Sequence, residues 1–215
     1  MSFDFNDAEV QKDFSELIPA GTICLLQINI KPGGFGNDGL LERNRDGDCM
    51  MLSCEFTVRG GPYNNRKVWQ RYVVEGRTDG QKTAVQISRA FLRGVLESAR
   101  GIRPADTSAE AVAGRRTEYG FADFQDMIFC AKIGTERGGL MPGEGPGGER
   151  YDDKNKIAAA VTCDDKRYIS PKEAGLTQRQ ATPPLNSSGA ATGSESRLSG
   201  GENKGSAPKR PGWAS

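Results

Sequence analysis

Residues 66–100 read RKVWQRYVVEGRTDGQKTAVQISRAFLRGVLESAR, and the spacing of the apolar side chains changes within this stretch. Residues 67–75 are rich in Val, Trp and Tyr and alternate between two faces, which is typical of a strand. Residues 84–100 repeat apolar side chains at helical spacing, and Gly101 is a suitable residue just beyond the end of a helix. The stretch therefore predicts a strand followed by one amphipathic helix.

Strand-like segments lie on both sides of this stretch. Two precede it, at 22–30 and 49–58, and two follow it, at 126–133 and 155–163. A short second helix is expected at 107–116. The order strand-strand-strand-helix-strand-strand is that of the OB-fold, a five-stranded Greek-key barrel. We therefore predict a mainly β, OB-like barrel with one main helix between its third and fourth strands.

Two long glycine-rich connections interrupt the predicted strands, at residues 31–48 and 134–154. Connections of this length are unusual in small domains and are often functional. In an OB-fold they join the first strand to the second and the fourth to the fifth, and these loops flank the surface that binds oligonucleotides. The loops therefore favour a binding function over a purely structural one.

The composition argues against a catalytic or metal site. The chain of 215 residues has no histidine, which excludes Ser-His and Cys-His nucleophile pairs and all histidine metal ligands. Its five cysteines form no C-x-x-C pair, so a zinc ribbon is not expected. The acidic pairs at 152–153 and 164–165 are adjacent residues that point to opposite faces of a strand, which does not suit a two-metal site. We expect no enzymatic activity, no cofactor and no bound metal.

The two ends of the chain differ in charge from the rest. Residues 1–16 carry five carboxylates against the single cation Lys12, whereas residues 171–215 consist mainly of small, polar and charged residues. We predict an acidic N-terminal arm at 1–16, an OB-like domain at 17–170 and a disordered tail at 171–215. Trp213 is a candidate partner-binding residue in that tail. A plain solvated linker is the alternative that the pattern leaves open.

Binding of unpaired nucleic acid requires cations that follow the phosphates and flat rings that stack on exposed bases. Lys67, Trp69 and Arg71 alternate along the third predicted strand, so all three can share one face. The pattern does not decide which face is buried, and a core Trp69 beneath a rim of solvated charges is the alternative. The full set of nucleic-acid-binding candidates is Lys31, Phe35, Arg43, Arg45, Tyr63, Arg66, Lys67, Trp69 and Arg71.

The predicted main helix offers a weaker candidate. Arg89 and Arg93 are one helical turn apart and together could hold a phosphate, but most such pairs belong to an ordinary solvated helix face. Arg93 also has the spacing of a salt bridge with Glu97. We favour the solvated face for these arginines.

Four motifs carry a resemblance to a known family: residues 30–34 (IKPGG), 54–58 (CEFTV), 61–69 (GPYNNRKVW) and 96–102 (LESARGI). With them, residues 17–170 resemble an uncharacterised family of proteins from phages and mobile elements of proteobacteria. That family is associated with single-stranded-DNA binding or accessory roles in recombination. The resemblance implies a replication or recombination setting and brings no catalytic residues with it.

These observations predict a protein that binds single-stranded DNA without strong sequence preference. We expect it to act in the bacterial host cytoplasm, because the odd cysteine count, the lack of a signal peptide and the lack of a membrane-length apolar run all favour that compartment. Replication or recombination proteins are candidate partners of the tail, and a homo-oligomer is compatible with the pattern. The alternative is a protein-interaction scaffold that docks phage or host proteins, which the near-balanced charge of 29 basic and 28 acidic residues favours.

Overall fold

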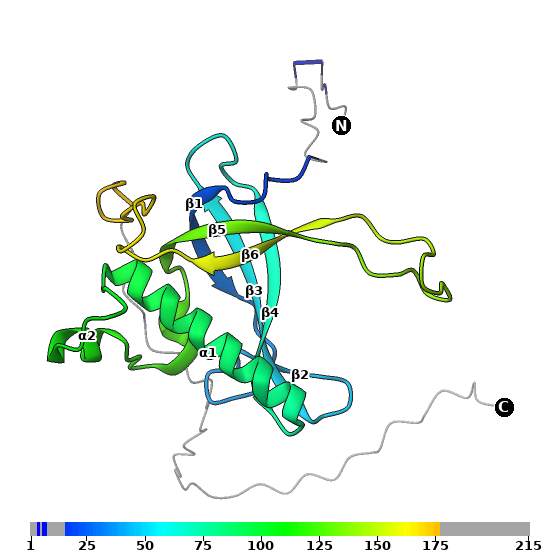
Figure 1. Ribbon diagram of the computed structural model, residues 1–215, viewed down its shortest axis with the longest axis horizontal. Helices are drawn as coiled ribbons and strands as arrows, with labels where there is room; N and C mark the ends of the chain where they lie inside the picture. Colours follow the sequence, from blue (N-terminus) through cyan, green and yellow to red (C-terminus); the bar gives the residue numbers. More distant parts are fainter. Residues whose placement is uncertain (1–3, 5, 8–15, 177–215) are drawn as a thin grey trace, which may run out of the picture. The chain divides into compact units, whose positions relative to one another are not determined.

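A computed structural model describes residues 4, 6–7 and 16–176 of the chain (Figure 1). Six strands and three helical segments follow one another in the described part. The strands are β1 (Ile23–Ile30), β2 (Leu41–Arg43), β3 (Cys49–Arg59), β4 (Lys67–Gly76), β5 (Ile128–Glu136) and β6 (Lys154–Ala160). The helices are α1 (Asp79–Arg100), α2 (Ala109–Gly114) and the short 3-10 helix η1 (Gly120–Phe124). The mainly β class and the single main helix after the third long strand are as the sequence predicts.

The six strands form one antiparallel sheet built around β3. One edge of β3 pairs with β4 along most of its length, and its other edge pairs with β1 and then with the three-residue β2. On the far side of β1 lie β5 and then β6, so the long strands follow the order β4-β3-β1-β5-β6. Strand β2 is an addition to the predicted set, and it extends the sheet where β3 runs beyond the end of β1.

The predicted closed barrel is not shown. Strands β4 and β6 are the two outer strands of the order, and they contact each other, but no backbone ladder joins them in the described part of the chain. One side chain bridges them instead, because Ile157 N of β6 donates a hydrogen bond to Gln70 Oε1 of β4 at 2.9 Å. A strand N–H that is taken by a side chain leaves that position unpaired in the sheet, so the sheet remains open here.

Alternation along β3 defines the inner face of the sheet. Leu52, Cys54, Phe56 and Val58 are all buried on that face, as the sequence pattern predicts. Strand β1 is buried on both sides at its start, because its Leu25 belongs to a second apolar cluster on the other face. That cluster also contains Ile128, Cys130 and Val161 and is covered in part by Tyr168 and Leu176.

The structure decides the orientation of β4, which the sequence leaves open. Val68 and Tyr72 are buried in the core, whereas Lys67 and Arg71 are exposed and Trp69 is 61% exposed. The predicted nucleic-acid-binding side chains of β4 therefore point away from the core. The alternative of a core Trp69 is wrong.

Helix α1 contacts β4, β5 and β6 (Figure 1). It begins at Asp79, five residues before the predicted start, because Thr78 and Gln81 form a capping box that satisfies the first free N–H groups. It ends at Arg100, and the left-handed conformation of the following Gly101 (φ 69°) closes the last turn. The amphipathic pattern located the helix body and its end, whereas the start depended on the cap.

Four aromatic rings join the helix to the inner face of the sheet. Phe91 of α1 stacks on Tyr72 of β4 with ring centroids 4.6 Å apart, and its edge meets Phe56 and Phe129 at 6.3 and 6.1 Å. Such ring pairs add to the stabilisation that burial of apolar area provides. Because β3, β4 and β5 each contribute one ring, the cluster fixes the helix against three strands at once.

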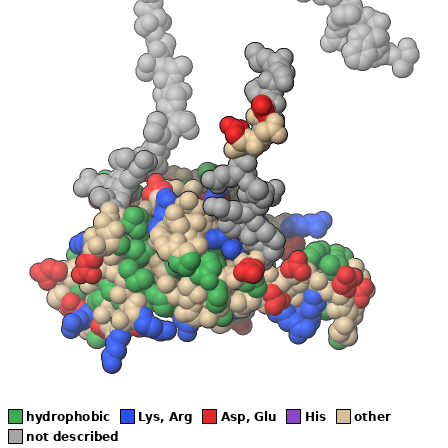
Figure 2. Space-filling model, turned by 90° about the horizontal axis from the view of Figure 1, so that it is seen from above, with side chains coloured by type: hydrophobic (Ala, Val, Ile, Leu, Met, Phe, Trp, Pro, Cys, Tyr) green, Lys and Arg blue, Asp and Glu red, His purple; other side chains and the backbone are tan. Residues whose placement is uncertain are grey.

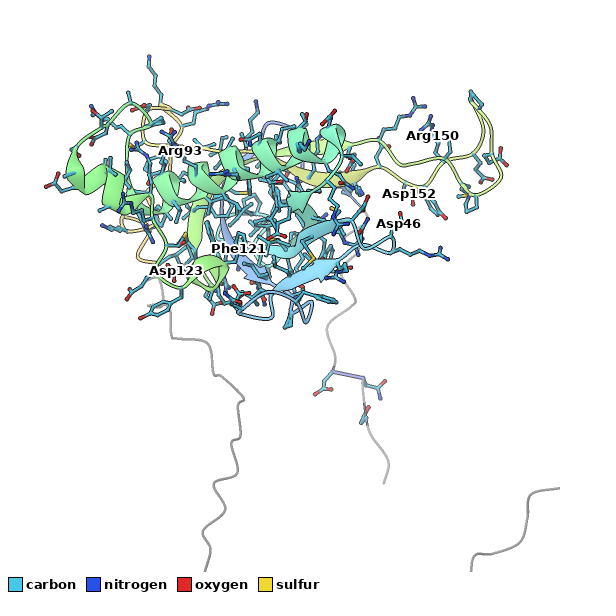
Figure 3. The ribbon with its side chains drawn as sticks, turned by 90° about the horizontal axis from the view of Figure 1, so that it is seen from below. Asp46, Arg93, Phe121, Asp123, Arg150 and Asp152 are labelled. Carbon is cyan, nitrogen blue, oxygen red and sulfur yellow. The ribbon has the colours of Figure 1, made fainter. Side chains whose placement is uncertain are left out.

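Residues between β5 and β6 form a long excursion that projects away from the sheet (Figures 1 and 3). The excursion carries a single isolated pairing, between Leu140 and Arg150, and Figure 3 labels Arg150 and Asp152 on it. At the other end of the described chain, Pro171 is buried and Leu176 packs on the second apolar cluster. In the described residues, no helix has both the length and the apolar composition needed to cross a bilayer.

Two tyrosines provide a matched test of this packing. Tyr72 Oη is buried and has no hydrogen-bond partner among the described residues, whereas Tyr168 Oη donates to Ser98 O at 2.7 Å. We expect Tyr72→Phe to raise the free energy of unfolding by about 1 kcal/mol, because it removes a desolvated hydroxyl that gains nothing in return. Tyr168→Phe should lower it by about 1 kcal/mol because a made hydrogen bond is lost. Urea denaturation measures both, and equal losses in the two variants would contradict the assignment.

Candidate nucleic-acid interface

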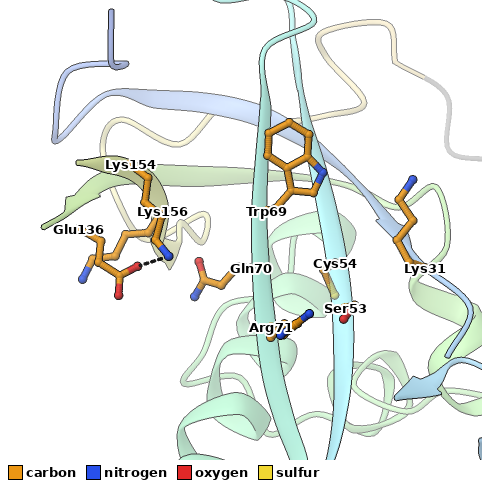
Figure 4. Close-up of a pocket in the computed structure, with 9 residues that line it drawn as sticks. All are labelled: Lys31, Ser53, Cys54, Trp69, Gln70, Arg71, Glu136, Lys154 and Lys156. Carbon is orange, nitrogen blue, oxygen red and sulfur yellow. Dashed lines mark ion pairs between the residues drawn. The ribbon is translucent and has the colours of Figure 1, made fainter. Parts of the chain in front are cut away.

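A groove of about 660 Å³ lies along β3 and β4 (Figure 4). Its lining comes from the end of β1, from β3 and β4, and from the facing ends of β5 and β6. The residues that line it are Lys31, Ser53, Cys54, Trp69, Gln70, Arg71, Glu136, Lys154 and Lys156. Three of the nine predicted nucleic-acid contacts, Lys31, Trp69 and Arg71, therefore meet in one concave site.

The register of β3 against β4 determines which side chains stand together on this face. Thr57 pairs with Lys67, Glu55 with Trp69, and Ser53 with Arg71. Directly paired residues of an antiparallel sheet project to the same side, so each exposed residue of β4 has a β3 neighbour beside it.

Glu55 connects the cationic and aromatic residues of the groove. Its carboxylate accepts from Lys67 Nζ at 2.8 Å, from Lys31 Nζ at 3.1 Å and from Trp69 Nε1 at 3.2 Å. The residue is only 7% exposed. Hydrogen bonds from these groups lower the pKa of Glu55 below its ordinary value of 4.5. The ammonium of Lys67 has the largest effect, and the ammonium of Lys31 and the indole N–H of Trp69 add to it. The carboxylate is therefore ionised at neutral pH and holds three candidate DNA contacts in place.

A second carboxylate supports the neighbouring part of the face. Glu42 of β2 accepts a hydrogen bond from Ser53 Oγ and lies 3.6 Å from Arg71. Arg71 is exposed and this separation is long for an ion pair, so the contact contributes little to stability. The guanidinium of Arg71 is thus free to exchange its carboxylate for another anion.

Lys154 and Lys156 of β6 also line the groove, and they are not among the predicted nucleic-acid contacts. Lys154 Nζ lies 3.4 Å from Glu136 Oε2, whereas Lys156 has no ion-pair partner among the residues that the structure describes. Their alternate spacing at the start of a predicted strand was the available signal. It was not sufficient, because their role depends on β6 lying next to β4.

The electrostatic character of the face is mixed with a positive surplus. Five cations, at positions 31, 67, 71, 154 and 156, stand among three carboxylates, at 42, 55 and 136. Figure 2 shows one side of the molecule on which basic and acidic side chains are interspersed with apolar ones. This is not the continuous positive channel that very tight electrostatic binding requires.

The other predicted contacts lie outside the groove lining. Arg43 stacks over the Phe35 ring at 4.7 Å from its centroid, and Arg45 is exposed on the following turn. Tyr63 packs partly on the apolar core, and the Arg66 guanidinium donates to Glu16 O at 2.6 Å. Lys67 shares its partner Glu55 with Lys31 and Trp69, which line the groove. Trp213 lies outside the described residues.

Of the two helix arginines, Arg93 has a structural partner, whereas Arg89 is exposed on the same helix. Arg93 and Arg115 both donate to Glu97 Oε1, at 2.8 and 2.6 Å, and Glu97 is buried. The pair between Arg93 and Glu97 confirms the salt bridge that the helical spacing predicts. Figure 3 labels Arg93 on α1 and Phe121 on η1, and both residues line a second groove of about 470 Å³. These contacts favour the structural interpretation of Arg93 over phosphate binding.

Comparisons with known proteins do not assign the chain to a family. Neither a protein-family model, nor a curated protein, nor a solved structure was found to match the chain. Within the described residues, no group of three or more Cys, Asp or Glu side chains is arranged to hold a metal ion. The candidate interface therefore rests on its own residues.

We expect Glu55→Gln to lower the free energy of unfolding at pH 7 by about 1 kcal/mol, because it removes a carboxylate paired with two half-exposed lysines. The folded-state pKa of Glu55 lies below its ordinary 4.5, so its contribution is present above that value and is lost as the pH falls through the folded pKa. The variant should therefore lose less stability than the wild type over this acidic range. Urea denaturation from pH 7 to pH 3 measures the difference.

Glu75→Gln is the matched control, because Glu75 is exposed on the neighbouring strand β4 and lies outside the groove. It should change neither the stability at pH 7 nor its acid dependence. Parallel curves for Glu55→Gln and the wild type would contradict the role of Glu55.

Proposed function

We propose that this protein binds single-stranded DNA without strong sequence preference, through the groove that crosses β3 and β4. The observation that carries the proposal is the exposed Trp69, which lines the groove and stands between Lys67 and Arg71 on the same strand. A flat ring offers stacking to any base, and flanking cations offer contacts to phosphates. Stacking and phosphate contacts do not distinguish one base from another. They therefore suit protective coating of the strand rather than recognition of a sequence.

An OB-like barrel is the fold that we infer for this function. The strand order β4-β3-β1-β5-β6 is the order of a five-stranded OB sheet before closure, and the bridge from Gln70 to Ile157 lies where closure would occur. The groove then corresponds to the OB surface on the second and third strands. The connections at 31–48 and 137–153 flank it, and Lys31 and Lys154 stand at their ends.

The resemblance of residues 17–170 to a phage and mobile-element family supports a setting in DNA replication or recombination. In that setting the protein would act in the bacterial host cytoplasm as a DNA-binding protein and not as an enzyme. Residues 171–215, with Trp213, would recruit replication or recombination proteins, and several copies could coat one strand as a homo-oligomer.

A protein-interaction scaffold is the second candidate function. The interspersed carboxylates at positions 42, 55 and 136 favour it, because each one opposes a phosphate in the groove. The two functions differ in one simple measurement. A folded protein that fails to bind single-stranded DNA at low salt supports the scaffold.

We expect Trp69→Ala to weaken binding of a thymidine oligonucleotide of about 30 nucleotides by about tenfold, the cost of one lost stack. Fluorescence anisotropy of the labelled oligonucleotide measures this affinity. Tyr119→Ala is the control, because Tyr119 is also exposed but lines a different pocket. Equal effects of the two substitutions would contradict a stacking role for Trp69.

The lysines of β6 should account for part of the salt dependence. Each phosphate contact with a single strand contributes about 0.7 to the slope of log affinity against log salt. Lys154→Ala with Lys156→Ala should therefore reduce the magnitude of that slope by about 1.4. The matched double variant Lys166→Ala with Lys172→Ala removes the same charge from exposed positions outside the groove and should leave the slope near the wild-type value. An unchanged slope in the variant with Lys154→Ala and Lys156→Ala would show that β6 does not contact the DNA.

A further inference from the structure

The last residue of the acidic arm, Glu16, lies close to strands that line the groove. Glu16 accepts from Arg66 through its backbone carbonyl at 2.6 Å. Ile18 is buried in the core, and its backbone N–H and C=O bond the side-chain amide of Asn155 at 2.9 and 2.8 Å. Residues 16–18 are therefore anchored between Arg66, just before β4, and Asn155, near the start of β6.

Both of these strands carry groove residues next to the anchor. Asn155 lies between Lys154 and Lys156 on β6, and Arg66, just before the start of β4, is three residues before Trp69. Three residues of strand span about 10 Å. The fifteen residues that precede Glu16 can span up to about 50 Å when extended, so the arm reaches every part of the groove.

The arm contains the two kinds of group that the groove is suited to bind. Residues 1–16 include the sequence Phe3-Asp4-Phe5-Asn6-Asp7, in which rings and carboxylates are interleaved, and five carboxylates in all against Lys12. Single-stranded DNA likewise presents flat rings and anions along one chain. Asp4 and Asp7 are exposed, so their charges are available to a cationic surface.

We infer that the acidic arm binds the groove of its own chain and competes there with single-stranded DNA. Carboxylates of the arm contact the groove cations that have weak or no partners, namely Arg71, Lys154 and Lys156, and a phenyl ring covers Trp69. Tethering gives such an arm an effective concentration of the order of millimolar, so a weak contact suffices. The competition favours long DNA strands, which make several contacts, over short fragments. The inference rests on the proposed function of the groove.

The test compares full-length chains at about 50 mM salt. An arm that occupies the groove for about three-quarters of the time lowers the apparent DNA affinity about fourfold. Asp4→Asn with Asp7→Asn should therefore bind the thymidine oligonucleotide about threefold more tightly than the wild type. Glu110→Gln with Glu173→Gln removes the same charge from exposed positions outside the groove and should bind as the wild type does.

A second measurement needs no DNA. With Trp213→Phe in every chain, Trp69 is the only tryptophan, and acrylamide quenching reports how accessible it is. Quenching should increase about twofold when Asp4 and Asp7 are neutralised, since a displaced arm uncovers the ring.

The two readouts separate the two proposals. Greater quenching without DNA binding in any chain supports the arm contact and overturns the proposed function. DNA binding that is equal in all chains, with unchanged quenching, overturns the arm contact and leaves the proposed function intact. Tighter DNA binding in the control variant to the same degree also overturns the arm contact, because total charge would then explain it.

Discussion

The contact of Phe91 with the rings of the inner sheet face is the constraint on which the rest of the structure depends. Its stack on Tyr72, at 4.6 Å between centroids, requires the Tyr72 side chain to point inward. Alternation along β4 then turns Lys67, Trp69 and Arg71 outward. A helix that packs on one face of the sheet thus determines, through one tyrosine, the chemistry of the opposite face.

Much of the fold could be predicted from local patterns, because alternation and helical spacing are local properties. The inward set of β3 and the body of α1 followed directly from such spacing. The start of α1 was missed although Thr78 and Gln81 carry the capping signature, since Gly80 between them disfavours a helix. Strand β2 was missed because its three residues form a strand only where β3 offers an unpaired edge beyond the end of β1.

The candidate site was less accessible to sequence reasoning, because its parts meet only through tertiary contacts. Trp69 and Arg71 share a strand and were recognised together. Lys156 is more than eighty residues away and joins them only because β6 lies beside β4, where Ile157 bonds Gln70. The importance of Glu55 was hidden for the same reason. A glutamate in a strand reads as a solvated residue until Lys31, Lys67 and Trp69 are seen around it.

The nearly buried carboxylate of Glu55 also separates the cations at the groove into two groups, one strongly paired and one weakly paired. A phosphate that took Lys31 and Lys67 away from it would leave a nearly buried charge with the Trp69 indole N–H as its one remaining partner, and that loss is more costly than breaking an exposed pair. Lys31 and Lys67 therefore remain paired with Glu55 and keep the Trp69 ring oriented, and because both side chains are half-exposed, their remaining N–H donors can contact a phosphate without breaking these pairs. Arg71, Lys154 and Lys156 have only exposed partners or none, so they can turn to an incoming anion at little cost. A strand bound in this groove would run its phosphates along β4 and β6 and its bases toward Trp69.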